Sequence, residues 1–243
     1  MRKRNIFLFF FSFVLYFTSN AQKAPVVIEL FTSQGCSSCP PADRLIAEID
    51  NTYPDQEVYI LSYHVDYWDY IGWKDPFASQ ANTQKQYEYA RRFRSRNVYT
   101  PQAVINGREH FTGSNKSQLY SRLQHYQSDE KIIGIELTEV NNKDQAVHVN
   151  YALDEGADEI TVAVVIKERT TAVKRGENRN RTLKNTNIVV TEQTVKLNGN
   201  QGSLSLNIPD WLTSDDDISI IAYATSWQTG VVGVTSSSLN QGS

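Results

Sequence analysis

The chain has 243 residues, with 24 Lys and Arg against 27 Asp and Glu, so its formal net charge at pH 7 is −3. This acidic balance lacks the basic surplus that is usual in nucleic-acid binders, so we expect no nucleic acid among the partners. Aromatic residues make up 11% of the chain, which is enough for a sizeable core, and the length suits one large domain or two modest ones.

Residues 1–21 have the organisation of a secretory signal peptide. Basic residues at positions 2–4 precede an apolar run at 6–17, and the small residues Ser19 and Ala21 offer a cleavage site. A membrane anchor is the alternative, but the run is short for a bilayer, which takes about 20 residues. We therefore expect an exported protein, periplasmic or extracellular, without a stable membrane anchor after cleavage. Cleavage removes three basic residues, leaving 21 Lys and Arg against 27 Asp and Glu, a net charge of −6.

The only two cysteines, Cys36 and Cys39, lie between a predicted strand and a predicted helix. Residues 26–31 form a short apolar, β-branched run typical of a buried strand. Apolar residues then recur at helical spacing, and two prolines suit a first helical turn, so we expect the helix to begin at about Pro40. This arrangement places both sulfurs at the start of a helix.

The close spacing of the cysteines favours a redox-active pair over a structural disulfide. A disulfide that closes four residues contributes about 2 kcal/mol, against roughly 4.7 kcal/mol for a hundred-residue loop. The unpaired N–H groups and the dipole of a helix start favour a thiolate. We therefore expect a redox pair in which an exposed Cys36 is the nucleophile and Cys39 resolves the mixed disulfide. A small local staple remains the alternative.

The following segments alternate strand and helix. We expect a strand at 57–65, a helix at 78–96, a hairpin over 98–113 with its turn at Asn106-Gly107, and a helix at 114–126. The predicted order is therefore strand, helix, strand, helix, two strands and helix.

This order, with CxxC before the first helix, resembles the thioredoxin fold over about residues 25–127. The stretch TPQAVING is similar to the corresponding stretch of glutaredoxins. The resemblance implies a cis peptide bond at Pro101 beside the reactive cysteine, with Thr100 and Pro101 shaping the substrate-binding edge. An ordinary proline at the start of a strand is the alternative for Pro101.

Four stretches together resemble the exported bacterial proteins of domain-of-unknown-function family 1223, over nearly the whole mature chain. They are ELFTSQGCSSCPPAD, HVDYWDYIGWKDPF, YTPQAVING and RGENRNRTL. The resemblance implies a thioredoxin-like domain and brings no established reaction with it.

Glu29 and His64 are the two titratable residues that could assist the cysteines. The thioredoxin resemblance implies a buried acid on the first strand as proton acceptor for Cys39, and Glu29 could take that role; an exposed or capped acid is equally open. His64, near the end of the second strand, could shuttle protons or bind a soft metal such as Cu(I) together with Cys36 and Cys39. A buried, hydrogen-bonded histidine is the default.

Aromatic residues are dense between positions 63 and 77. Trp68 and Trp73 could roof a substrate cleft, or they could pack the two halves of the chain together.

The second half of the chain has the sequence pattern of an all-β protein. Segments at 132–140, 146–153, 160–166, 186–195, 203–208 and 218–225 have strand length and are separated by polar turns, which suggests an antiparallel β-sandwich. We therefore expect a signal peptide at 1–21, an α/β thioredoxin-like domain at 22–130 and an antiparallel β-sandwich-like domain at 131–243.

A cluster of basic residues interrupts the acidic second half. It consists of Lys174, Arg175, Arg179, Arg181 and Lys184. The plain interpretation is a solvated hairpin loop. The alternative is a loop that reaches the first domain and places Arg179 or Arg181 beside Cys36. There the arginine would stabilise a thiolate or bind an acidic ligand.

Taken together, the sequence predicts a thiol–disulfide oxidoreductase that acts on protein or small-molecule thiols and disulfides and needs no cofactor. A copper carrier using Cys36, Cys39 and His64 is the second hypothesis. A binding module whose disulfide has no catalytic role is the third.

Overall fold

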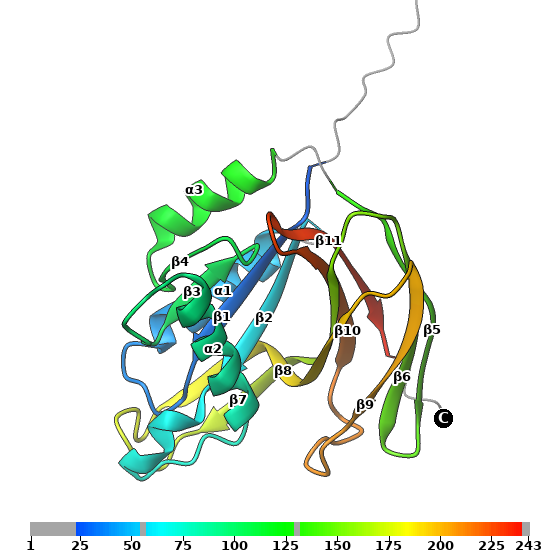
Figure 1. The fold of residues 1–243 in the computed structure, drawn as a ribbon. Helices are drawn as coiled ribbons and strands as arrows, with labels where there is room; N and C mark the ends of the chain where they lie inside the picture. Colours follow the sequence, from blue (N-terminus) through cyan, green and yellow to red (C-terminus); the bar gives the residue numbers. More distant parts are fainter. Residues whose placement is uncertain (1–22, 54–56, 129–131, 240–243) are drawn as a thin grey trace, which may run out of the picture.

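The computed structural model describes residues 23–53, 57–128 and 132–239 (Figure 1). The expected signal peptide lies outside these residues. No helix within them is long and apolar enough to cross a bilayer.

One eight-stranded mixed sheet runs through both halves of the chain, in the order β11-β10-β7-β8-β2-β1-β3-β4. At its centre β1 and β2 are parallel, and every residue of both is buried. On one side β3 and β4 continue the sheet antiparallel, and on the other β8 joins β2 in parallel. The strands are β1 (Val26–Thr32), β2 (Val58–His64), β3 (Gln102–Ile105), β4 (Glu109–Thr112), β7 (Glu159–Ala172), β8 (Thr182–Lys196), β10 (Ile218–Ser226) and β11 (Gly230–Ser238).

Helices cover the β1–β4 part of the sheet on both faces (Figure 1). α1 (Pro40–Thr52) and α3 (Lys116–Tyr126) pack on the face to which Ile28 and Leu30 point. α2 (Gln80–Arg92) packs on the opposite face, with the ring of Phe31 against its Tyr89. The period of two in β1 therefore separates two apolar cores.

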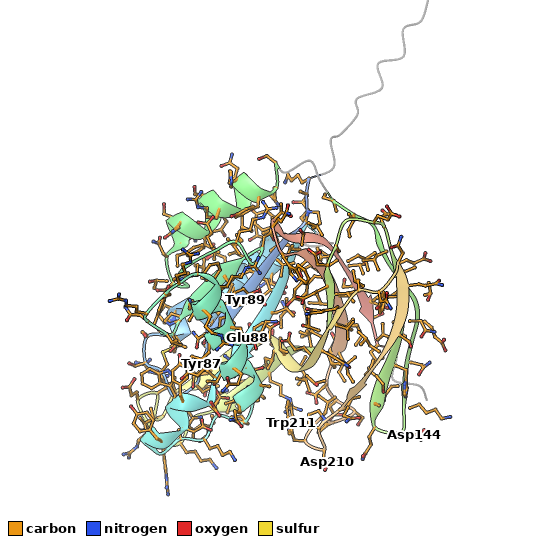
Figure 2. The ribbon with its side chains drawn as sticks, viewed as in Figure 1. Tyr87, Glu88, Tyr89, Asp144, Asp210 and Trp211 are labelled. Carbon is orange, nitrogen blue, oxygen red and sulfur yellow. A yellow bond between two sulfur atoms is a disulfide. The ribbon has the colours of Figure 1, made fainter. Side chains whose placement is uncertain are left out.

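A second, three-stranded sheet packs on β7 and β10 and forms the group of strands opposite the helices in Figure 1. Its order is β5-β6-β9, from β5 (Ile135–Lys143), β6 (Ala146–Leu153) and β9 (Gln201–Asn207). The β5–β6 hairpin turns at Asp144 and Gln145, both at positive φ, and Figure 2 marks Asp144 at its tip.

The large sheet curls until its β11 end meets the β3–β4 turn. The Val231 amide donates to the Asn106 carbonyl over 2.9 Å, and the Asn106 side chain accepts from the Val27 amide over 2.8 Å. Gly230 has φ +77°, and a Cβ atom there would collide with the Asn106 carbonyl, so the approach requires glycine.

The expected fold class, an α/β thioredoxin-like domain followed by an antiparallel β-sandwich-like domain, is wrong. The protein is mostly β, with few helices, and strands β7, β8, β10 and β11 extend the same sheet that contains β1 to β4. The physical reason lies at β2: its backbone and its Ser62 hydroxyl need a partner, and β8 supplies one, with Ser62 Oγ donating to the Thr186 carbonyl over 2.7 Å.

Most local elements agree with the sequence, although several of their bounds differ. α1 begins at Pro40, as expected. α2 is shorter than predicted, covering residues 80–92, and α3 begins at Lys116, where Asn115 caps it by accepting from the Gln118 amide. β11 was not predicted, because its sequence GVVGVTSSS has two glycines and a serine run.

Candidate functional site

Cys36 and Cys39 are joined by a disulfide at the N-terminus of α1, with Cα atoms 5.4 Å apart. β1 brings the chain to this point, and Cys39 is the N-cap residue of the helix. The Cys39 carbonyl accepts from the amides of Ala42 and Asp43, at 2.8 and 3.1 Å. Prolines at 40 and 41 carry no N–H, so the first turn offers few amide donors of its own.

Both cysteines are fully buried, each with 0% of its surface exposed, which corrects the expectation of an exposed Cys36. The Cys36 sulfur lies 3.3 Å from the Ser38 hydroxyl and 3.8 Å from the Thr100 carbonyl. Ser37 and Ser38 are themselves exposed, so Cys36 lies immediately beneath the surface. Neighbouring segments close over the sulfurs.

Thr100, Trp68 and Trp73, three of the four residues expected to bind substrate, lie near the cysteine loop. The Thr100–Pro101 peptide bond is cis, as predicted. Trp68, in the 3₁₀ helix Asp66–Ile71, donates from its ring nitrogen to Thr100 Oγ1 over 2.8 Å. Trp73 donates to the Gln34 side chain over 3.2 Å.

The basic segment also reaches the cysteine loop, but neither Arg179 nor Arg181, the two residues that we expected there, makes the contact. We call residues 173–181, between β7 and β8, the covering loop. Its Glu177 carboxylate accepts from the Ser37 amide over 2.9 Å, and its Asn178 side chain donates to the carbonyls of Gln34 and Cys36, both over 2.9 Å. Arg179 is exposed. The covering loop therefore reaches the cysteine loop, and an acidic and an amide side chain make its contacts.

Arg181 orients the Asn178 side chain, because its guanidinium donates to the Asn178 side-chain oxygen over 3.0 Å. Asn178 is fully buried, and its side-chain amide group donates both of its hydrogen bonds to the cysteine loop. The sequence gives no signal for this role, since a lone asparagine in a polar stretch normally indicates a turn.

Asp43, a residue that we did not predict, is the acid nearest to the pair along α1. It lies one turn after Cys39, and its backbone amide donates to the Cys39 carbonyl over 3.1 Å. Asp43 is buried, and Thr32 Oγ1 donates to its carboxyl over 2.8 Å. Burial raises its pKa from 3.8 to about 6, because water no longer solvates the charge. A carboxyl group with this pKa can accept or donate a proton near neutral pH.

His64 and Asp75 form a fully buried pair beneath the cysteine loop, with His64 Nδ1 2.7 Å from Asp75 Oδ2. Burial disfavours the charged form of each residue, but the attraction between opposite charges outweighs it. The carboxylates of Asp75 and Asp43 raise the pKa of His64, and His64 lowers the pKa of Asp75. Asp75 Oδ2 also accepts from the Gln34 amide over 2.7 Å. His64 is therefore linked to the cysteine loop through Asp75, and it is a buried, hydrogen-bonded histidine.

Glu29 does not assist the cysteines in this arrangement. It faces away from α1, because the residues on either side of it in β1 pack against that helix. Its carboxylate accepts from the hydroxyls of Tyr89 and Tyr223 and lies 3.3 Å from the Lys85 amine. Figure 2 marks Tyr89 on α2, the helix that covers this face. The role expected for Glu29 is open to Asp43.

Cys36, Cys39 and His64, the alternative copper ligands, do not form a three-residue metal-binding group in this structure, in which the two sulfurs are bonded to each other. The Nδ1 atom of His64 is committed to Asp75. Over residues 23–53, 57–128 and 132–239, no three His, Cys, Asp or Glu side chains converge in a way that could hold a metal ion.

Comparison with known proteins places this site in a family. A protein from Agrobacterium tumefaciens, solved by a structural genomics consortium, is 30% identical, with 92% of this chain and 98% of that one covered and a TM-score of 0.67. HBP35 of Porphyromonas gingivalis shares the fold at 13% identity and a TM-score of 0.58, with 90% of this chain and 76% of that one covered. No curated protein matches. The family model described as "Protein of unknown function (DUF1223)" matches residues 27–224, and the chain belongs to that family.

Proposed function

We propose that this protein is an exported thiol–disulfide oxidoreductase that exchanges the Cys36–Cys39 disulfide with external thiols and disulfides. The observation that carries the proposal is the buried Asp43 one helical turn from Cys39, with a pKa of about 6, beside a disulfide that closes only four residues. A staple of that size needs no titratable acid, whereas a resolving cysteine needs a group that takes and returns its proton.

The exchange balances without a cofactor. An external thiolate attacks the Cys36 sulfur, the bond between the two cysteine sulfurs breaks, and Cys39 leaves as a thiolate that takes a proton from Asp43. A second external thiolate then attacks the external sulfur of the mixed disulfide and releases Cys36 as a thiolate. The products are one external disulfide and the reduced pair. In the reverse direction, Asp43 accepts the proton of Cys39 before Cys39 attacks.

The roles of the two sulfurs follow from their neighbours along the chain. The Cys36 sulfur lies 3.3 Å from the hydroxyl of the exposed Ser38, whereas Cys39 is the N-cap of α1, one turn before Asp43. An external sulfur arriving from the surface therefore meets Cys36 first.

A binding module with an inert disulfide is the competing proposal, and exchange kinetics separate the two. The native protein is reduced with dithiothreitol, freed of reductant and mixed with oxidised glutathione, and disulfide formation is followed by mass spectrometry. We expect reoxidation at least about tenfold faster than for a peptide spanning residues 31–43, because the folded site provides the helix start and the acid. Reoxidation slower than that of the peptide would show that the fold only encloses the bond.

A further inference from the structure

Building on the proposed function, we propose that the site selects thiols and disulfides that carry a carboxylate. The Ser37 amide would be a carboxylate-binding position, which Glu177 of the covering loop occupies in the resting protein and which the carboxylate of the substrate takes during exchange.

The first observation concerns the amide donors around the pair. The amides of Cys39, Ala42 and Asp43 donate to backbone carbonyls at the start of the helix. The Ser37 amide instead donates to Glu177 over 2.9 Å, and hydrogen bonds from Ser37 hold the pKa of Glu177 below its usual value. This donor therefore prefers an ionised carboxylate, as amides near a helix start generally do.

The second observation is the charge beside this position. Lys174, Arg175 and Arg179 are exposed and lie within three residues of Glu177, so each is within about 11 Å along the chain. None of the three forms an ion pair with any residue that the structure describes. Three cations near one carboxylate along the chain leave a local excess of positive charge on a protein whose net charge is −3, or −6 without residues 1–21. Such a patch attracts a second anion.

The third observation is the closed state of the site. Cys36 and Cys39 are fully buried, and the covering loop is held on the cysteine loop by Glu177 and Asn178. A substrate carboxylate that replaces Glu177 at Ser37 removes one of these two attachments. Its binding therefore loosens the cover at the moment when its own thiolate arrives beside Cys36. A thiol without a carboxylate has no group for this exchange.

The test compares three small thiols that differ mainly in charge: 3-mercaptopropionate, 2-mercaptoethanol and cysteamine. Each reduces the oxidised native protein under pseudo-first-order conditions, and rates are compared at equal thiolate concentration. We expect 3-mercaptopropionate to react about tenfold faster than cysteamine, with the ratio falling toward one in high salt, because exposed charges are screened. The peptide spanning residues 31–43 supplies the ratio without the loop.

Two variants locate the effect, each with a matched control. Arg179→Glu is expected to reduce the preference for 3-mercaptopropionate by about threefold or more, whereas Lys143→Glu, in the distant β5–β6 hairpin, leaves it unchanged. Glu177→Ala frees the Ser37 amide and is expected to speed reduction by all three thiols, most of all by 3-mercaptopropionate. Glu155→Ala makes the same change of charge at an exposed turn and is expected to have no effect.

The outcomes keep this inference apart from the proposed function. If dithiothreitol reduces the native protein but the three thiols react alike, the carboxylate preference is wrong and the oxidoreductase proposal stands. If Glu177→Ala slows all three thiols, Glu177 supports the reactive state instead of closing the site, and the inference is again overturned. If no thiol reduces the native protein, both proposals fail.

Discussion

Cys36→Ser is expected to abolish exchange with small disulfides, by about three orders of magnitude or more, because it removes the sulfur that an incoming group meets first. Cys39→Ser is expected to react once and stop, since the mixed disulfide at Cys36 has no resolving thiol. After incubation with oxidised glutathione, mass spectrometry should therefore show one glutathione on the Cys39→Ser variant and none on the Cys36→Ser variant.

The two variants lose the same disulfide, which makes each the control for the other. Both lose the same four-residue disulfide, whose contribution is about 2 kcal/mol, so a difference between them reports the roles of the sulfurs. Equal glutathione adducts on both variants would contradict the assignment, since the two sulfurs would then be equally accessible.

Asp43→Asn is expected to make the protein more stable and less active at the same time. The amide has the size of the carboxyl group and can still accept from Thr32 Oγ1, so the packing is retained. It cannot accept a proton from Cys39, and loss of a general base slows a reaction about a hundredfold or more. Rapid-mixing measurement of the resolving step at neutral pH checks this. Glu29→Gln is the control: it alters a buried carboxylate away from α1, and its exchange rate should match the wild type.

The stability change has a defined pH window. The folded pKa of Asp43, about 6, lies above its ordinary value of 3.8, so the folded state binds the proton more tightly. The stabilisation from this proton is fully present below about pH 4 and is lost as the pH rises through about 6, a change of about 3 kcal/mol. In urea unfolding of the oxidised protein, the free energy of unfolding of Asp43→Asn should not show this decrease between pH 4 and 7. An identical pH dependence in both proteins would show that Asp43 is not a buried, protonated acid.

The sequence predicts the local elements of this fold better than their assembly. The strand before Cys36, the helix from Pro40 and the Asn106-Gly107 turn follow from periodicity and turn chemistry, which act between near neighbours. The pairing of β8 with β2 joins residues more than a hundred positions apart, and nothing in the strand at 182–196 says which edge it will meet. The misassigned fold class comes from this one pairing.

The same distinction holds for the site. The cysteines, Thr100 and Pro101 carry a local pattern, and the structure brings them together. Asp43 was missed although it lies four residues after Cys39, because an acid in a first helical turn ordinarily indicates a favourable dipole interaction at the surface. The contacts of Glu177 and Asn178 depend on the long-range placement of the covering loop, and the arginines around them attracted the prediction instead.

The most direct test of the account is the reduction potential of the Cys36–Cys39 pair. The native protein is equilibrated with dithiol buffers of defined potential, quenched by alkylation, and its oxidised fraction is measured by mass. A thiol–disulfide oxidoreductase is expected to have its midpoint between about −120 and −270 mV, the range of known exchange proteins. A midpoint below about −300 mV, typical of structural disulfides, would contradict the account and leave Cys36–Cys39 as a staple.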